Sequence, residues 1–404
     1  MKKLILPACL VAGTAVGAGM IALPMVLCKI GLLGTLGLIL SVWAFMYISS
    51  LIGVEINLRA RQGLPLGALG KFYDSPMAAV IGTISVILLI YALLSAYLHG
   101  GASVIQSSIV GYSGETVSLR YIVIIYALGL GSLLMTPVRP VLQANRVLFT
   151  GLLIFFGLLV FGLLSKIKMT PLPWLSDYVS NPLSWSQAIT LLSASFGFQV
   201  VLHTLTNFCQ QDPKLIKQSI FWGSLIPVVV YIIWTFSTLT ILYQEAPEAY
   251  AQLQRGQLEA GQFIQTLAQT ATWPVVQILA SLISLLAIIK SSIGVGLGLL
   301  QTWQEQINRR YQLSKITFQV STVLLTLIPP LLTALLVPQL FLKALSFAGV
   351  INIVIAIFLP VWLINRPKAQ VLPTFYPIAN NKLLQRLCLI FGIIVVICEV
   401  INLI

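Results

Sequence analysis

Eleven long apolar runs constrain the fold of this chain more than any other feature of its sequence. They span residues 4–28, 31–58, 76–108, 119–137, 147–166, 187–208, 217–243, 273–302, 315–336, 340–363 and 384–404. A helix of about 20 apolar residues is long enough to cross a bilayer. Only 8% of the 404 residues are charged, whereas a soluble protein has about 25%. We therefore expect an all-α membrane protein with about eleven transmembrane helices, and we exclude a cytosolic enzyme, a nucleic-acid binder and a disordered chain.

Basic residues predict the orientation of these helices, because cytoplasmic loops of membrane proteins collect Lys and Arg. The net charge is +13. With a cytoplasmic N-terminus, the cytoplasmic side carries Lys2, Lys3, Arg59, Arg61, Lys71, Arg139, Arg146, Lys214, Lys217, Arg309, Arg310, Lys315, Arg366, Lys368, Lys382 and Arg386. The opposite side carries fewer, namely Lys29, Arg120, Lys166, Lys168, Arg255 and Lys343. We therefore expect the N-terminus in the cytoplasm and the C-terminus outside.

Two of the predicted helices contain clusters of small residues that favour a break in the helix. The first has three glycines within Gly13–Met20 and then Pro24, and the sixth has the stretch Ser193–Gln199. Glycine-rich backbone unwinds easily, but close packing of helices through small residues is the alternative interpretation. A membrane helix is interrupted only where the freed backbone groups line a cavity or meet protein.

The positions of these clusters suggest an internal repeat. If residues 1–166 and 187–363 form two halves of five helices, with 384–404 as an additional helix, helices one and six occupy corresponding positions. Five is odd, so the halves would enter the membrane from opposite sides. Paired interruptions of this kind point to the substrate site of a transporter. Freed amides attract a carboxylate and freed carbonyls attract a cation or an amine, and a zwitterionic amino acid needs both.

Four segments resemble one known family. Gly13–Pro24 is similar to the first-helix signature of the hydroxy and aromatic amino acid permease family, which includes bacterial tyrosine-specific and tryptophan-specific permeases. Tyr91–Tyr97, Ser195–Phe198 and Gly294–Leu299 resemble its third, sixth and eighth helices. The resemblance implies the leucine-transporter-type 5+5 inverted repeat with broken helices one and six, within the amino acid–polyamine–organocation superfamily. It also implies proton-driven import of an aromatic amino acid across the bacterial inner membrane, with a periplasmic C-terminus.

The resemblance also implies a substrate site. Its members are Thr14, Ala15, Gly17, Ala18, Gly19, Tyr97, Ser195, Phe196, Gly197 and Phe198. The amides of residues 17–19 would hold the carboxylate, bordered by residues 14 and 15, and backbone groups of residues 195–197 would hold the ammonium. Phe198 would line the side-chain pocket and Tyr97 would close over the substrate, although ordinary packing is the alternative for both. The sequence departs from the family at Gln199, where a His is frequent, and at His203, where a Pro is expected.

Lys290 is a charge near the middle of the run 273–302. A lysine at that depth is costly, and such residues usually face a cavity and mark a functional path. In sodium-coupled transporters of the implied fold, hydroxyls of helix eight and carbonyls of helix one hold a sodium ion. Aligned on Lys290-Ser291, the Lys290 ammonium would replace that ion, with Gly13 and Val16 offering the carbonyls. Burial favours the neutral form of an amine, so Lys290 is also a candidate carrier of the coupling proton. A purely stabilising contact is the alternative.

Other polar residues give weaker signals. Glu55 and Arg59 are expected to form an interfacial ion pair, with a gate or proton path as the alternative, and Glu399 is expected at the interface. His203 is expected to be a packing residue or a secondary proton site. The loop from Gln244 to Thr272 is expected to hold one short surface helix.

The function that these signals favour is secondary active transport. The expected partners are an amino acid, a coupling proton and the lipid bilayer, with no nucleic acid, metal or cofactor; the scattered cysteines form no CxxC pair, and the oligomeric state is left open. The alternative within the class is a carrier or exchanger of another neutral amino acid. A membrane-embedded enzyme is the rival from another class, but it needs clustered Asp, Glu or His at membrane depth, and the runs offer almost none.

Overall fold

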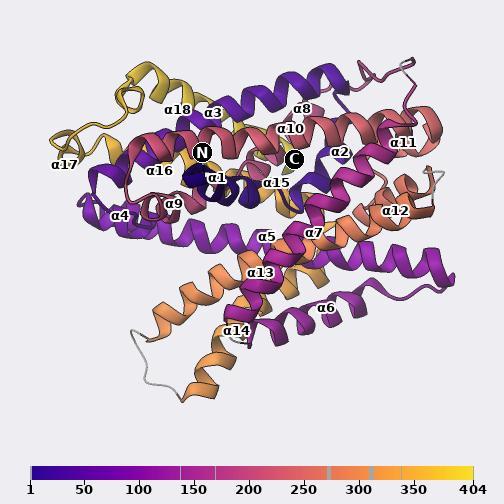
Figure 1. The fold of residues 1–404 in the computed structure, drawn as a ribbon, viewed down its shortest axis with the longest axis horizontal. Helices are drawn as coiled ribbons and strands as arrows, with labels where there is room; N and C mark the ends of the chain where they lie inside the picture. The colour runs from indigo at the N-terminus through magenta and orange to yellow at the C-terminus, as the bar shows by residue number, and fades with distance from the viewer. Residues whose placement is uncertain are drawn as a thin grey trace.

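The computed structural model describes residues 2–136, 138–168, 170–270, 274–308, 314–337 and 339–403. Arg309 and Arg310, which contribute to the predicted charge distribution, lie outside these residues. The described chain consists of helices and their connections, without a β-strand, and the helices lie side by side in a bundle (Figure 1). The all-α class expected from the composition is confirmed.

Every apolar run of the sequence contains at least one helix. The helices within these runs are α1 (Lys2–Ala15), α2 (Gly19–Leu27), α3 (Gly31–Arg59), α5 (Pro76–Ser113), α6 (Leu119–Leu134), α7 (Val138–Leu164), α8 (Pro182–Ser195), η1 (Phe198–Val201), α9 (Leu202–Phe208), α10 (Pro213–Glu245), α13 (Pro274–Asn308), α14 (Lys315–Leu336), α15 (Leu340–Ile353), η2 (Val354–Phe358), α16 (Leu359–Ile364) and α18 (Lys382–Leu403). The connections hold α4 (Leu66–Phe72), α11 (Pro247–Gln254), α12 (Ala260–Thr270), α17 (Pro367–Gln370) and η3 (Pro377–Asn380).

Length and apolarity identify the membrane spans. Among the described residues, eight spans are long and apolar enough to cross a bilayer, and the bent pair α1 and α2 makes up to nine. Helix α6 and the described part of α7 are shorter apolar helices. The chain is therefore a multi-pass membrane protein, while the total of eleven spans stays a prediction.

Local sequence explains where several of these helices begin and end. Asp212 caps α10 by accepting hydrogen bonds from the amides of Lys214 and Leu215, and Pro213 occupies the first turn, where its missing N–H is not needed. Asn181 caps α8 in the same manner. Helix α5 ends at Gly114, whose φ of 72° is a left-handed conformation that glycine adopts without strain.

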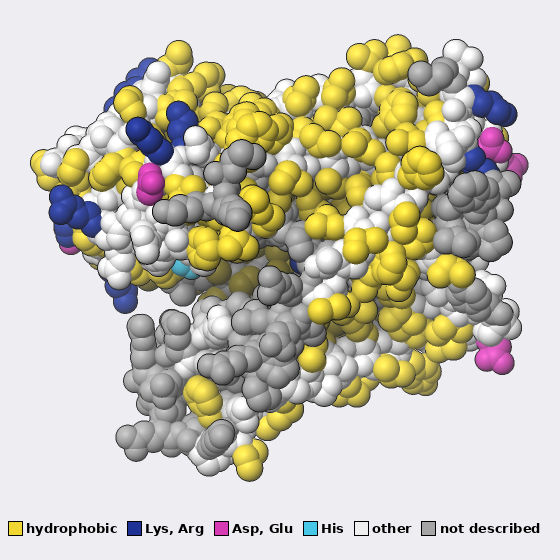
Figure 2. Space-filling model, viewed as in Figure 1, with side chains coloured by type: hydrophobic (Ala, Val, Ile, Leu, Met, Phe, Trp, Pro, Cys, Tyr) yellow, Lys and Arg dark blue, Asp and Glu magenta, His cyan; other side chains and the backbone are white. Residues whose placement is uncertain are grey.

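The two ends of the bundle differ. Helices α4, α9 and α17 lie together at the left of Figure 1, and α11 and α12 lie at the right; we call these the α4 end and the α11 end. Figure 2 shows hydrophobic side chains over the middle of this face and Lys and Arg gathered mainly at the α4 end. Large exposed apolar side chains such as Ile125, Leu128 and Phe161 suit a surface that faces lipid rather than water.

The connection between α10 and α13 differs from the expectation of one short surface helix. It holds two helices, and Phe263, Ile264 and Leu267 of α12 are buried. Helix α12 packs against α5 and α13. The reason is amphipathicity: apolar residues spaced three and four apart give a short helix one face that it must bury. The prediction of a surface helix was therefore wrong for α12.

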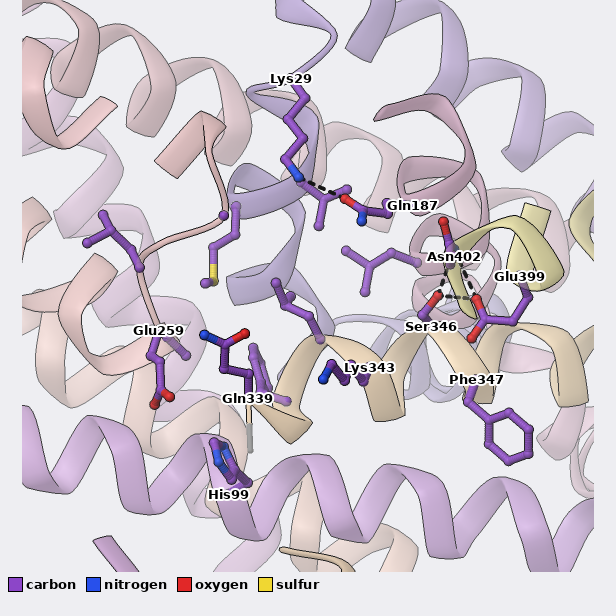
Figure 3. A pocket seen from close by; sticks show the side chains of 18 of the residues that line it. Lys29, His99, Gln187, Glu259, Gln339, Lys343, Ser346, Phe347, Glu399 and Asn402 are labelled. Carbon is purple, nitrogen blue, oxygen red and sulfur yellow. Dashed lines mark hydrogen bonds between the residues drawn. The ribbon is translucent and has the colours of Figure 1, made fainter. Parts of the chain in front are cut away.

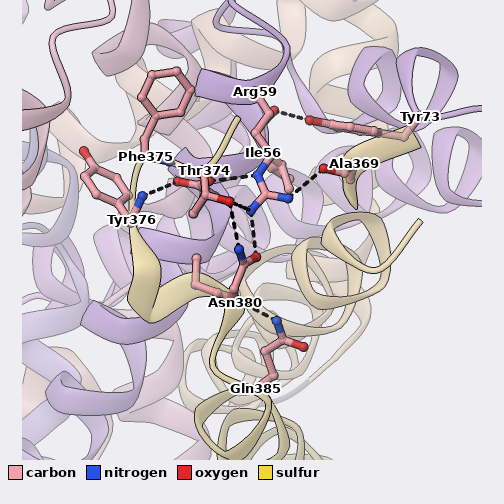
Figure 4. A network of polar contacts seen from close by, with 11 residues as sticks. Ile56, Arg59, Tyr73, Ala369, Thr374, Phe375, Tyr376, Asn380 and Gln385 are labelled. Atoms are coloured by element: carbon pink, nitrogen blue, oxygen red, sulfur yellow. Dashed lines mark hydrogen bonds and ion pairs between the residues drawn. The ribbon is translucent and has the colours of Figure 1, made fainter. Parts of the chain in front are cut away.

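A buried ion pair fastens the α4 end. Arg59 Nε lies 2.8 Å from Glu55 Oε1, one helical turn earlier on α3. The guanidinium also donates to the carbonyl of Ala369 and to Asn380 Oδ1, both at 2.7 Å. Glu55 in turn accepts the amide of Tyr376 at 2.8 Å. The predicted ion pair is confirmed, and it is buried because the segment from α17 to η3 covers it (Figure 4); its depth at the membrane interface stays a prediction.

Candidate substrate and coupling site

The first predicted break is present. Helix α1 ends at Ala15 and α2 begins at Gly19, and the two are bent by 54° relative to each other. The last carbonyls of α1 and the first amides of α2 therefore leave the regular hydrogen-bond ladder in the interior of the bundle. The amide of Ala18 lies 3.3 Å from Ser291 Oγ. Within the part of the chain that the structure describes, the amides of Gly17 and Gly19 have no acceptor.

The second predicted break is present too, with a different geometry. Helix α8 ends at Ser195, and the chain resumes as the 3₁₀ turn η1 at Phe198 before α9 begins. The intervening Gly197 donates its amide to the carbonyl of Ala194 at 3.0 Å. Residues 182–208 still count as one span without a sharp bend. Helix six is interrupted in its winding, whereas helix one also changes direction.

Lys290 reaches the first break from α13. Its Nζ lies 2.5 Å from the carbonyl oxygen of Gly13 and 3.1 Å from that of Val16. Both oxygens belong to the C-terminal end of α1, where the helix dipole is negative and favours a cation. The structure therefore brings together the four residues predicted for the coupling site, since the neighbouring Ser291 contacts the same break.

Two glycines allow this close approach. A Cβ added to Gly17 would lie 2.5 Å from Ser291 Oγ, and one added to Gly19 would lie 3.0 Å from Ser195 Oγ. The break of helix one thus packs directly against α13 on one side and against the end of α8 on the other. Glycine is needed here for space rather than for a positive φ.

Tyr231 is a site residue that sequence reasoning missed. It lies in the interior of α10, and its hydroxyl is 2.7 Å from the carbonyl oxygen of Ala15 and 2.9 Å from that of Ser195. One side chain therefore contacts the ends of both broken helices. Its ring also packs edge-on against Phe196, with centroids 5.3 Å apart. A tyrosine within an apolar run carries no signal of such a role.

Two further side chains outside the predicted set hold the broken helices. Trp234 Nε1 donates to the carbonyl of Met20, the second residue of α2, at 2.8 Å. Asn352 Nδ2 donates to the carbonyl of Ser193 at 2.8 Å. Asn352 lies two residues before the start of the π-helical turn η2 at Val354, where the winding of the helix changes.

The remaining predicted site residues occupy different surroundings. Tyr97 and Phe198 are buried. Thr14, the second-last residue of α1, is exposed, and Gly294 of α13 has open space where a side chain would be. Figure 2 shows the surface hollowed between the half that holds α4 and α9 and the half that holds α13 and α14.

His203 and Glu399, two titratable residues considered in the sequence analysis, lie away from the substrate and coupling residues. His203 is half-buried in α9 and contacts Thr204 Oγ1 at 3.2 Å. Glu399 of α18 is 6% exposed and accepts hydrogen bonds from Ser346 Oγ and Asn402 Nδ2. Glu399 lies near the C-terminal end of α18, and its side chain is buried because α18 packs against α8 and α15; its place at the membrane interface stays a prediction.

Comparison with known proteins decides the family. The model of the tryptophan/tyrosine permease family matches residues 1–399. The chain belongs to this family. The family resemblance expected from Gly13–Pro24 is thereby confirmed, and the permease is a member of a transporter family rather than of an enzyme family.

Three relatives cover nearly the whole permease. Tyrosine-specific transport system 1 of Haemophilus influenzae is 31% identical, over 98% of this chain and 96% of its own length. The tryptophan-specific transport protein of Pseudomonas aeruginosa is 27% identical over 87% and 83%. Glutamine transporter 2 of Aliivibrio fischeri is 24% identical over 98% and 99%.

Proposed function

We propose that the permease imports an aromatic amino acid by alternating access, driven by protons and independent of sodium. The two halves 1–166 and 187–363 form an inverted repeat of the leucine-transporter type, and α18 is the additional helix. The N-terminus is cytoplasmic, so the α4 end faces the cytoplasm and the α11 end faces the periplasm. The family and the tyrosine- and tryptophan-specific relatives support the substrate class, and the basic residues at the α4 end support the orientation.

The observation that carries the coupling proposal is the position of Lys290 Nζ on the carbonyl oxygens of Gly13 and Val16. An ammonium there occupies the place of a cation and joins α13 to the break of helix one. When the amine loses its proton, the electrostatic part of that attachment is lost, and α1 is free to change its angle to α13. Proton binding is thereby linked to the conformation of the broken helix.

The substrate site lies beside this attachment. The free amides of Gly17 and Gly19 point to a carboxylate ligand, since they form the positive N-terminal end of α2. Ser291 Oγ accepts a hydrogen bond from the amide of Ala18. An entering carboxylate therefore replaces this hydroxyl or binds next to it. The carbonyls at the end of α8 and the hydroxyl of Tyr97 serve the ammonium and the substrate side chain.

A carrier of another neutral amino acid is the second candidate. Glutamine transporter 2 aligns with the permease over almost its full length, so the family scaffold is compatible with a polar, non-aromatic side chain. The amides and carbonyls of the two breaks recognise the α-carboxylate and α-ammonium that all amino acids share. Selectivity therefore rests on the side-chain pocket around Phe198 rather than on these backbone groups.

Uptake by proteoliposomes tests both parts of the proposal. Labelled tyrosine, tryptophan and glutamine are offered under an imposed pH gradient, with or without sodium. We expect tyrosine or tryptophan to accumulate without sodium, and Lys290→Met to abolish accumulation while exchange of internal for external substrate persists. Lys214→Met, which removes an exposed lysine at the start of α10, is the matched control and should accumulate normally. A strict sodium requirement, or full accumulation by Lys290→Met, would contradict the coupling proposal.

A further inference from the structure

Charged side chains balance one another at one end of the bundle but not at the other. A cavity of about 510 Å³ at the α11 end is lined by two lysines, Lys29 and Lys343, and by two carboxylates, Glu259 and Glu399 (Figure 3). The formal charges of these four residues cancel. At the α4 end three cations gather near a single carboxylate, that of Asp74. Positive charge is therefore in excess at this place.

Arg366, Lys368 and Lys382 form this group, which we call the basic cluster. Lys368 Nζ lies 3.3 Å from Asp74 Oδ2, and Arg366 Nη2 donates to the carbonyl oxygen of Asp74 at 2.9 Å. Lys382 donates from Nζ to the side-chain oxygen of Asn365, the residue before Arg366. Among the described residues, the pair of Lys368 with Asp74 is the only ion pair of the cluster. Three cations and one carboxylate leave two positive charges uncompensated.

An exposed apolar face of α5 begins beside the basic cluster. Helix α5 starts at Pro76, two residues after Asp74. Met77, Val80 and Ile84 are 62%, 58% and 50% exposed. Their spacing of three and four residues places them on one face of the helix. In a multi-pass membrane protein such a face meets the acyl chains of the bilayer rather than water.

Trp362 indicates the depth of the cluster in the membrane. It lies in α16, four residues before Arg366, and is 50% exposed. Its Nε1 donates to Ser75 Oγ, directly before α5, at 3.3 Å. Exposed tryptophans of membrane proteins prefer the headgroup level between water and hydrocarbon. The basic cluster and the apolar face of α5 therefore meet where a phospholipid changes from headgroup to acyl chain.

We propose that the basic cluster binds the headgroup of an anionic phospholipid, whose acyl chains lie along the apolar face of α5. The phosphate meets the ammonium groups of Lys368 and Lys382 and the guanidinium of Arg366, because charge-assisted hydrogen bonds to phosphate are strong. Basic groups between transmembrane helices recognise anionic headgroups in this manner. A zwitterionic phospholipid carries its own cation and leaves the excess charge of the cluster uncompensated. Binding of this lipid does not depend on which amino acid the permease carries.

Native mass spectrometry of the purified full-length permease in neutral detergent tests the inference, because it resolves individual bound lipids. The probes are phosphatidylglycerol, phosphatidylcholine with the same acyl chains, and glycerol phosphate, which has no acyl chains. We expect the first phosphatidylglycerol to bind at least about tenfold more tightly than phosphatidylcholine, since the attraction of two uncompensated cations exceeds the ~1.4 kcal/mol that a factor of ten represents. Glycerol phosphate should bind far more weakly than phosphatidylglycerol, because it cannot cover the apolar face of α5.

Two variants should move the affinity in opposite directions. Lys368→Gln/Lys382→Gln, at two exposed positions, should lose most of the preference for phosphatidylglycerol. Asp74→Asn removes the competing carboxylate and should bind phosphatidylglycerol more tightly than the native protein does, a gain that a folding defect cannot produce. The matched control is Arg255→Gln/Lys343→Gln, which removes two exposed cations at the α11 end and should keep the native preference.

Three results would overturn the inference. The first is equal affinity of the native permease for the two phospholipids. The second is an equal loss of preference in the two double variants, which would indicate attraction by net charge alone. The third is binding of glycerol phosphate as tight as that of phosphatidylglycerol, which would indicate a site for a soluble anion.

Discussion

Among the described residues, Arg59 and Lys290 are buried cations whose surroundings differ in kind. Arg59 at the end of α3 meets the carboxylate of Glu55, the carbonyl of Ala369 and the side chain of Asn380. Lys290 in the middle of α13 meets the carbonyl oxygens of Gly13 and Val16 at a helix break. Arg59 meets a carboxylate of its own helix and groups of a folded connecting segment. The carbonyls that meet Lys290 are available to it only because helix one is interrupted.

The difference separates a structural contact from one suited to switching. A guanidinium is always charged and matches several planar acceptors at once, so the Arg59 network holds one geometry. An ammonium is a single point charge that can lose its proton, and carbonyls at a helix end have no charge of their own to trap it. A buried cation must be met by polar groups. At Arg59 this requirement stabilises one arrangement of the fold, whereas at Lys290 it leaves more than one state available.

The largest effect on stability is expected from breaking the Arg59 network. Arg59→Met leaves Glu55 buried without its cation and removes the anchor of the connection between α17 and η3. Loss of one partner of a buried ion pair costs about 3–5 kcal/mol. Chemical unfolding in detergent measures the change in the free energy of unfolding. The exposed Arg61→Met, two residues further along, is the control, and equal stability of the two variants would show that the network does not hold the fold.

A smaller stability effect, but a large effect on uptake, is expected at Gly17. Gly17→Ala places a Cβ 2.5 Å from Ser291 Oγ, and such overpacking costs about 1–3 kcal/mol. The clash pushes the break of helix one away from α13, so the initial rate of uptake should fall. Gly17→Ala/Ser291→Ala removes the clashing oxygen and should recover part of both losses in a double-mutant cycle. If the double variant is no more stable than Gly17→Ala and takes up substrate no faster, the contact with Ser291 is not the reason that position 17 requires glycine.

An intermediate test concerns the link between the two breaks. Tyr231→Phe removes the hydroxyl that contacts Ala15 and Ser195 while retaining the ring that packs on Phe196. A lost hydrogen bond lowers stability by about 0.5–1.5 kcal/mol, and uptake should slow because the broken ends are no longer held together. Tyr243→Phe, near the end of the same helix, provides the comparison. Identical uptake kinetics in both variants would remove Tyr231 from the site.

The smallest effect is expected from an exposed ion pair at the α4 end. Lys368 Nζ lies 3.3 Å from Asp74 Oδ2, but the two side chains are 42% and 72% exposed. Such pairs contribute about 0–1 kcal/mol because water and salt screen them. Asp74→Asn should therefore unfold at nearly the same denaturant concentration as the native protein. Destabilisation as large as that of Arg59→Met would show that burial does not explain the strength of the Arg59 network.

The sequence allowed the breaks and the lysine contact to be predicted because both follow from local requirements. Three glycines between Gly13 and Met20 weaken a helix wherever it lies, and a lysine at the depth of Lys290 must find oxygen acceptors. Gly13 and Val16 were expected as partners from the family resemblance, because in sodium-coupled transporters of the implied fold carbonyls of helix one help to hold the sodium ion. The roles of these residues in binding and coupling stay predictions.

Other features were beyond the reach of the sequence. Tyr231 lies 36 residues from Ser195 and 216 from Ala15, and an apolar run gives no indication of which face of α10 meets the breaks. The burial of Glu399 could not be foreseen from its place near the end of an apolar run. Its contacts with Ser346 and Asn402 depend on how α18 rotates against α15. The burial of α12 likewise depends on the position of α5, against which it packs.

The sequence by itself determined that the chain crosses a membrane repeatedly, where two of its helices are interrupted, and that one buried lysine must meet backbone oxygens. Each of these follows from short segments, since apolarity and backbone hydrogen bonding are satisfied or violated within a single helix. Only the tertiary structure decided that Tyr231 joins both breaks, that Glu55 and Arg59 lie under the segment from α17 to η3, and that Lys29 and Glu399 face one cavity. These arrangements depend on the rotation and offset of packed helices, which many distant contacts set together.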